Sequence, residues 1–275
     1  GYSIAVLTFG WDWWAAVLFG VLGAVVFAVI LGLPTLRLRA DYLAIVTIAA
    51  AQAVYYALSA SDFADVTGGS AGLHGFAESF YALNPFPAGR YNLGFTELSE
   101  RGLFVTIIGW IIVILVALFM VALTRSPWGR VLKGIREDED AVRSLGKNVF
   151  SYKLQSMIIG GSIASLGGMV FVMSSQTNQP SNWGTNFTFM LWTILLLGGA
   201  ATILGPIIGG MVFFGLLMFL QSIMEGLVNM GWLPFLDIAQ VGQIRFLLVG
   251  VALMVLVIFR PQGIFGNKKE LQFNG

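Results

Sequence analysis

The sequence predicts an all-α, polytopic membrane protein. Of its 275 residues, 57% are hydrophobic and 11% are charged, and the mean hydropathy is +0.83. Several apolar runs approach the ~20 residues that a helix needs to cross the hydrocarbon core of a bilayer. Because no water satisfies backbone groups there, each run must form a helix. The alternative, a soluble protein with buried helices, is disfavoured by the length of these runs.

Seven spans are predicted from these runs, and each is bounded by turn-forming or charged residues. In chain order they are Trp13–Leu33, Leu43–Ala60, Leu103–Leu123, Leu154–Ser174, Phe187–Leu204, Pro206–Met224 and Arg245–Phe259. We treat residues 1–275 as one transmembrane domain with two long connections: an external loop, 61–102, and a cytoplasmic loop, 125–153.

The orientation follows from the basic residues, which favour the cytoplasmic side of a membrane. If the spans alternate, twelve Lys and Arg residues lie on one side and three (Arg90, Arg101 and Arg245) on the other. The C-terminus and the loop 125–153 are therefore predicted to be cytoplasmic. The chain opens GYSIAVLTFGWDWW, without Met and without the features of a signal peptide, so we expect that its true N-terminus is missing.

Residue types that carry chemistry are scarce. No Asp, Glu, Lys, Arg or His lies in the interior of a predicted span, which disfavours a proton-coupled carrier. No GxxxxGK[ST] loop, nucleophile–base pair or H-E-x-x-H motif appears, and there is no Cys. The single histidine, His74, has no companion that would form a metal site. The sequence thus indicates no membrane enzyme, bound cofactor, metal or nucleic-acid partner.

Small and neutral polar residues are the candidates for a transport path. Gly160, Ala164 and Gly168 repeat at helical spacing, which favours tight helix packing, with path lining as the alternative. The stretch Leu195–Gly210 contains several glycines and Pro206, so it is either a tight turn or a broken helix beside a path. The candidate path residues are Thr47, Gln52, Thr67, Gly68, Gly69, Gly198 and Gly199.

The cytoplasmic loop is predicted to hold two short helices. Ser126 and Pro127 are typical of a helix start, and Trp128, Val131, Leu132 and Ile135 recur on one face, which predicts an amphipathic helix at the membrane surface. A second helix starts at Asp138 as N-cap and ends at Gly146. Its apolar side, Ala141, Val142 and Leu145, suits packing into a groove on a partner.

Residues Asp140–Gly146, DAVRSLG, have the E-A-A-x-x-x-G spacing of the coupling loop of ABC importer permeases, with Asp for Glu and Val for the second Ala. The I-x-L-P that follows in many importers is absent. The wider run SPWGRVLKGIREDEDAVRSLGKN resembles the branched-chain amino-acid ABC transporter permeases of the LivM type. So do LRLRADYLAIVT, TGGSAGL, LLGGAATILGPIIGG and FRPQGIFG, in the same order along the chain.

This resemblance implies a permease subunit that contains a cytoplasmic coupling helix and sits in a bacterial or archaeal cell (inner) membrane. It implies a second permease subunit, two cytoplasmic ATPase subunits that bind ATP and Mg, and an extracytoplasmic substrate-binding protein. The cargo would be a branched-chain or related hydrophobic amino acid. The implied ATPase-coupling interface consists of Arg136, Glu137, Asp138, Glu139, Asp140, Ala141, Arg143 and Gly146.

Two alternatives stay open at this point. One is the same type of importer carrying urea or short amides. The other, of a different class, is an ATP-independent channel or secondary carrier. TGGSAGLHG in the external loop would either contact the binding protein or be an ordinary exposed turn.

Overall fold

The computed structural model describes residues 1–38, 40–92, 97–199 and 202–230, together with 247, 250, 251, 254, 258, 259 and 263–266. The chain divides into two compact units, Gly1–Gly184 and Thr185–Gly275. The elements of the first unit are α1 (Tyr2–Phe9), α2 (Trp13–Thr35), α3 (Ala40–Ser59), η1 (Ser61–Phe63), α4 (Ala64–Thr67), η2 (Gly69–Ala71), β1 (Leu73–His74), α5 (Glu78–Tyr81), β2 (Arg90–Asn92), β3 (Glu97–Ser99), α6 (Glu100–Arg125), α7 (Pro127–Glu137), α8 (Glu139–Ser144), α9 (Val149–Ser175), β4 (Thr177–Asn178) and η3 (Pro180–Trp183). The second unit contains α10 (Thr185–Gly198) and α11 (Leu204–Asn229).

Five helices among the described residues are long and apolar enough to cross a membrane: α2, α3 (from Tyr42), α6, α9 and α11. At a rise of about 1.5 Å per residue, the 23 residues of α2 extend roughly 35 Å, more than the ~30 Å of a hydrocarbon core. These helices cover five of the predicted spans, and the protein is a multi-pass, all-α membrane protein. The last predicted span, Arg245–Phe259, lies mostly outside the described residues.

The helix at the predicted span Phe187–Leu204 is shorter than predicted. Helix α10 has 14 residues and ends at Gly198, so it extends only about 21 Å. It packs against α11 through Ile194, Leu197, Phe213 and Leu217. A Cβ on Gly209 would lie 2.4 Å from the Ile194 carbonyl oxygen. Glycines of Leu195–Gly210 therefore allow the backbones of α10 and α11 to approach closely.

Helix α11 also differs from its prediction, because it continues past Met224 to Asn229. Glu225 therefore lies within the helix, where its carboxylate accepts a 2.7 Å hydrogen bond from the Gln221 amide. The expectation that no ionisable side chain lies inside a span holds for Pro206–Met224 but not for the whole helix.

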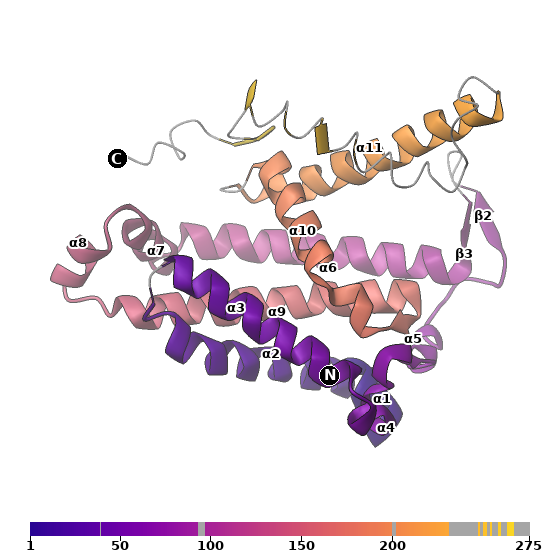
Figure 1. Cartoon of the computed structure of the whole chain (residues 1–275), viewed down its shortest axis with the longest axis horizontal. Helices are drawn as coiled ribbons and strands as arrows, with labels where there is room; N and C mark the ends of the chain where they lie inside the picture. Colours follow the sequence, from indigo (N-terminus) through magenta and orange to yellow (C-terminus); the bar gives the residue numbers. More distant parts are fainter. Residues whose placement is uncertain are drawn as a thin grey trace. The chain divides into compact units, whose positions relative to one another are not determined.

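In the first unit, the axes of α2, α3, α6 and α9 are roughly aligned, with α7 and α8 at one end and α1, α4 and α5 at the other (Figure 1). We call these the α7–α8 end and the α1–α5 end. Helices α2 and α9 pack antiparallel and close together. A Cβ on Gly32 would lie 2.6 Å from the Leu154 side chain, and one on Gly161 would lie 3.7 Å from Ala28.

The packing of α2 against α9 does not involve the small residues Gly160, Ala164 and Gly168. A Cβ on Gly160 would meet no atom within 4 Å, whereas one on Gly168 would lie 3.2 Å from the Trp183 ring. Ala164 and Gly168 line a cavity instead. The favoured interpretation of the stripe, tight helix packing, therefore does not describe its contacts in this unit.

Each end of the first unit has its own buried core. At the α1–α5 end it gathers buried side chains from α1, α2, α5, α6 and α9 around Phe76, including Tyr2, Phe80, Tyr81, Phe104 and Met173. The pairing of β1 with β4 (Leu73 with Asn178, His74 with Thr177) ties the loop 61–102 to the segment after α9. At the α7–α8 end the core is Ile135, Val142 and Val149, flanked by Val131, Leu132 and Tyr152.

Candidate functional site

The turn that leads from α6 into α7 depends on a glycine. A Cβ on Gly129 would lie 2.5 Å from the Thr124 carbonyl oxygen and 2.6 Å from that of Leu123. The Ser126 hydroxyl accepts a hydrogen bond from the Gly129 N–H at 3.3 Å, which confirms Ser126 as an N-cap. Helix α7 thus leaves α6 with its first turn capped and close to the chain that precedes it.

The amphipathic face of α7 packs inside the protein. Val131, Leu132 and Ile135 contact Val142 and Val149. The Trp128 indole N–H donates to the Gln155 side chain at 2.7 Å. The prediction that this face lies on the membrane surface is wrong for Ile135, which is buried, because α8 and the start of α9 supply an apolar surface closer to hand.

Helix α8 is short and its two ends are fixed by side-chain and backbone hydrogen bonds. The Asp138 carboxylate accepts from the N–H groups of Asp140 and Ala141, each at 3.0 Å. Gly146 has φ +77°, a left-handed conformation that favours glycine, and its N–H donates to the Arg143 carbonyl at 3.0 Å. The predicted cap and terminator are both confirmed.

Helix α8 is tied to α9 through Glu139, whose two carboxylate oxygens are both engaged. One accepts from Arg143 at 2.9 Å and the other from Lys153 at 2.5 Å. Arg143 also pairs with Asp140 at 2.8 Å. The Glu139–Lys153 contact thus joins α8 to α9 across the turn between them, whereas the Glu139–Arg143 pair lies within α8.

The predicted coupling residues form one accessible surface on α8 and the end of α7. Arg136, Glu137, Asp138, Asp140, Ala141, Arg143 and Gly146 are exposed, and Glu139 is half-buried. Of the predicted apolar side of α8, only Val142 is buried, whereas Leu145 is 78% exposed. The surface therefore combines acidic groups with an uncovered leucine beside the glycine turn.

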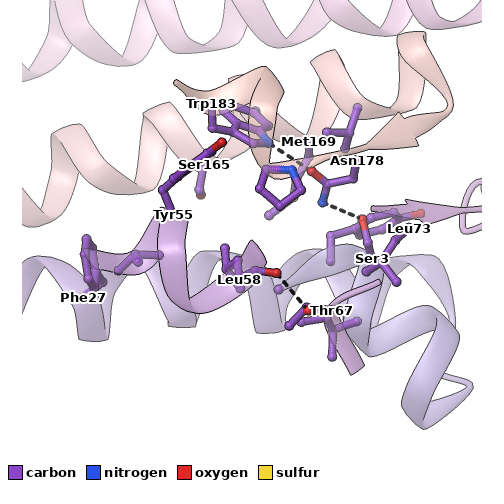
Figure 2. A pocket seen from close by; sticks show the side chains of 18 of the residues that line it. Ser3, Phe27, Tyr55, Leu58, Thr67, Leu73, Ser165, Met169, Asn178 and Trp183 are labelled. Carbon is purple, nitrogen blue, oxygen red and sulfur yellow. Dashed lines mark hydrogen bonds between the residues drawn. The ribbon is translucent and has the colours of Figure 1, made fainter. Parts of the chain in front are cut away.

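At the α1–α5 end, a cavity of about 470 Å³ opens between α1, α2, α3, α9 and η3. We call it the Trp183 cavity. Figure 2 shows the hydrogen-bond chain on its wall. The Trp183 indole N–H donates to the Asn178 side-chain oxygen at 3.0 Å, and the Asn178 amide donates to the Ser3 hydroxyl at 3.1 Å. Asn178 thus fixes Trp183 relative to α1.

Much of the cavity lining is apolar, and the described residues that form it include no Asp, Glu, Lys, Arg or His. Phe27, Val54, Leu58, Met169 and Val172 are among its apolar residues. Such a cavity suits a neutral or aliphatic group rather than a bare charge.

Of the predicted path residues, the structure brings only Thr67 to this cavity. Its hydroxyl donates to the Leu58 carbonyl at 3.0 Å (Figure 2). The same hydroxyl accepts from the Gly69 N–H at 3.1 Å. Gly68 and Gly69 follow in left-handed conformations, with φ +75° and +55°. A Cβ on Gly68 would overlap the Gly72 carbonyl, so these glycines shape the loop beside the cavity.

The remaining path residues lie elsewhere. The Thr47 hydroxyl bonds back to the Leu43 carbonyl on α3 at 2.9 Å, and Gln52 is half-buried on α3 outside the cavity lining. Gly198 and Gly199 belong to the α10–α11 hairpin, where the Phe265 N–H donates to the Gly198 carbonyl at 3.0 Å. No sequence pattern had predicted a site role for Ser3, Asn178 or Trp183. The turn-forming run TNQPSNWG was the available signal for the last two.

No group of three or more His, Cys, Asp and Glu side chains that would hold a metal ion occurs in the described part of the chain. His74 is exposed, and a ring nitrogen lies 3.2 Å from the Ala71 carbonyl oxygen.

The five long apolar helices place the chain among polytopic membrane proteins. Residues 1–258 match the family of the branched-chain amino acid transport system permease component, and the chain belongs to that family. It is a transport subunit rather than an enzyme.

The most similar relatives include permeases named for branched-chain amino acids. The probable branched-chain amino acid transport permease LivM of Methanocaldococcus jannaschii is 27% identical over 256 residues, covering 92% of this chain and 68% of the relative. The high-affinity LivM permease of Escherichia coli K12 is 26% identical, covering 96% and 60%. The chain thus spans between 60% and 68% of the length of these two relatives.

A third relative is named for a different cargo. The autoinducer 2 import permease LsrC of Photorhabdus laumondii is 29% identical over 126 residues, covering 44% of this chain and 36% of the relative. No solved structure matches the chain.

Proposed function

We propose that the chain is the membrane-spanning permease subunit of an ATP-driven importer for branched-chain or related hydrophobic amino acids. Its family and its LivM relatives support this cargo class. ATP and Mg would be bound by two separate cytoplasmic ATPase subunits. A second permease subunit would complete the path, and an extracytoplasmic binding protein would deliver the substrate.

The observation that carries the coupling role is the construction of α8. A helix of only 6 residues is marginal in isolation, yet here both ends are capped and Val142 anchors it in a buried cluster. Its outward surface carries Asp140, Ala141 and the exposed Leu145. We infer that this surface enters a groove on the ATPase, with Leu145 as the apolar contact and the acidic groups at its rim.

The orientation that this role requires agrees with the distribution of basic residues. The α7–α8 end would face the cytoplasm, and the α1–α5 end the opposite side. The C-terminus would be cytoplasmic, as the positive-inside rule predicts.

The Trp183 cavity would receive the hydrocarbon side chain of the substrate on the external side. Its apolar lining matches an aliphatic group, and Thr67, Ser3 and Asn178 provide polar groups nearby. Its lining has no charged partner for the α-carboxylate or α-ammonium, which would need backbone groups or helix ends elsewhere on the path.

Uptake in proteoliposomes tests this function. The assembled complex should accumulate radiolabelled leucine, isoleucine or valine only when both ATPases and ATP are present. Uptake by this chain alone without ATP would instead indicate a channel or secondary carrier. Urea and acetamide belong in the same substrate panel, and preferential uptake of either would overturn the cargo class.

The proposed roles of the two ends are separable in that assay. Leu145→Ala should reduce ATPase association and substrate-stimulated ATP hydrolysis. Asn178→Ala, which releases Trp183, should raise the KM for leucine while ATPase association stays intact. If both variants change the same quantity, the assignment of separate roles to the two ends is wrong.

A further inference from the structure

A second cavity, of about 930 Å³, lies at the α7–α8 end of the first unit. We call it the basic cleft. Its lining comes from the α2–α3 connection, α8 and the start of α9: Leu36, Arg37, Leu38, Leu43, Glu139, Arg143, Lys147, Asn148, Val149, Phe150 and Lys153. It is separate from the exposed tip of α8, since Leu145 does not line it.

The charge in this cleft is unbalanced. Among the described residues, its lining contains four cationic side chains and one carboxylate. That carboxylate, on Glu139, already has both oxygens engaged by Arg143 and Lys153. Arg37 and Lys147 make no ion pair with any carboxylate among the described residues, and the Arg37 guanidinium lies over the Phe150 ring, 5.6 Å from its centroid. The cleft therefore holds two cations that an incoming anion would pair.

The position of the cleft indicates the kind of anion. It lies beside the ends of three helices that are long and apolar enough to span a membrane: α2 ends at Thr35, α3 begins at Ala40 and α9 begins at Val149. The same wall carries apolar side chains, and Leu38 is 44% exposed. Cations and apolar groups together at this depth match a phosphate headgroup and the glycerol region beneath it.

We propose that the basic cleft binds the phosphate headgroup of an anionic phospholipid of the cytoplasmic leaflet. Arg37 and Lys147 bind the phosphate, and Leu36, Leu38 and Leu43 contact the lipid below it. The choice of leaflet rests on the orientation in the proposed function, whereas the binding site itself does not.

The test compares lipid retention by the purified full chain in nanodiscs made of phosphatidylcholine with 30 mol% phosphatidylglycerol. After transfer to detergent, native mass spectrometry counts the bound lipids. The wild type should retain phosphatidylglycerol in preference to phosphatidylcholine. In the double variant Arg37→Gln/Lys147→Gln, that preference should fall about 25-fold, since each juxtamembrane cation contributes roughly a fivefold effect.

The matched control is Arg130→Gln/Lys133→Gln, which removes the same charge from exposed positions on α7 outside the cleft. Its lipid preference should change less than twofold. The variant Arg37→Lys, which retains the charge, should keep the preference and shows that loss of binding is not loss of folding. An unchanged preference in the double variant overturns the proposal.

Two further arms separate the sources of the anion. Free inorganic phosphate, added during detergent transfer at a concentration matched in ionic strength by sodium chloride, should not displace the lipid beyond the salt effect. Displacement by phosphate alone would make the cleft a site for soluble phosphate. If the double variant instead loses co-purifying ATPase with its lipid preference unchanged, the cleft is a protein-docking surface. Because lipid counting needs no transport, failure here leaves the proposed import function untouched.

Discussion

At the α1–α5 end of the first unit, side-chain hydrogen bonds join residues that are far apart in the chain, whereas the side-chain hydrogen bonds and ion pairs of the α7–α8 end join residues that are close in sequence. The Tyr81 hydroxyl donates to the Met173 carbonyl at 2.7 Å across 92 positions, and Asn178 reaches Ser3 across 175. At the other end, the Lys153–Glu139 contact spans 14 positions and the Trp128–Gln155 bond spans 27. The α1–α5 end is therefore held by hydrogen bonds between distant segments of the chain. The side-chain bonds of the α7–α8 end lie mainly within one short stretch.

This difference has a consequence for stability. A change at the α1–α5 end separates whole helices, because its contacts connect α1, the loop 61–102 and the segment after α9. A change at the α7–α8 end loosens one short helix and leaves the bundle in place. The four predictions below test this contrast, in order of decreasing expected effect.

Gly72→Ala should have the largest effect. Gly72 has φ +76°, and a Cβ there would lie 2.5 Å from the Asn178 carbonyl oxygen and 2.7 Å from the Gln179 Cα. Strain and overlap together should cost about 3 kcal/mol. The thermal midpoint of monodisperse protein in detergent should fall accordingly.

Gly75→Ala is the matched control for Gly72→Ala. Gly75 has a similar φ of +75°, but a Cβ there would meet no atom within 4 Å. Only the backbone strain remains, about 1 kcal/mol. Equal losses in the two variants would mean that the β1–β4 approach does not stabilise this end.

Gly146→Val should come second. A β-branched residue at φ +77° is strained by about 2 kcal/mol, although open space surrounds the position. We expect α8 to lose its ordered end, and ATPase co-purification and transport to fall, while the thermal midpoint of the bundle changes little. Gly146→Asn, which tolerates a left-handed conformation, should retain most activity. Unchanged co-purification in the Val variant would place the ATPase interface elsewhere.

Asp138→Ala should have a smaller effect of the same kind. It removes the acceptor for the Asp140 and Ala141 N–H groups, which is worth about 1 kcal/mol of α8 stability. The substrate-stimulated ATPase rate reports the loss, and Asp138→Asn should restore it because Asn also caps helices. If Asn and Ala behave alike, capping is not what Asp138 contributes.

Tyr2→Phe should have the smallest effect at neutral pH, within a few tenths of a kcal/mol, because the buried Tyr2 hydroxyl has no hydrogen-bond partner among the described residues. Burial, with neighbouring Tyr81 acting in the same direction, raises the pKa of Tyr2 from 10.0 to about 12. The unfolded chain therefore loses this proton first, and wild-type stability should decline as the pH rises from 10 to 12. The midpoint of the Phe variant should decline less over that range, and identical pH profiles would contradict this account.

The contrast between the two ends also explains what the sequence could predict. Ser126, Asp138 and Gly146 were identified as caps and terminator because each acts on backbone within a few residues of itself. The approximate positions of α2, α6 and α9 followed from their apolar length, although α9 begins at Val149 and not at the predicted Leu154. The Asn178–Ser3 hydrogen bond at the cavity and the β1–β4 pairing could not be predicted in this way. Both depend on segments that only the folded bundle brings together.

The same reasoning applies to the predictions that differed from the structure. The apolar residues of α7 were assigned to the membrane surface because periodicity shows that a face is apolar but not what covers it. Leu145 shared a predicted face with Val142, yet α8 ends at Ser144, so Val142 is buried within the helix while Leu145 lies exposed at the C-cap. Helix α10 appeared as a full span because the apolar run continues through the glycines at which the helix ends.

The self-contained core of the α7–α8 end bears on how such permeases diversify. Ile135, Val142 and Val149 bury one another within a stretch that enters at Gly129 and returns at Tyr152. A segment with its own caps, core and ion pairs can be exchanged between homologous chains as a cassette without redesign of the helices that carry it. A lineage could thereby change the ATPase that drives a permease while keeping the substrate path. A chimera that exchanges residues 126–153 between two homologous permeases would test this.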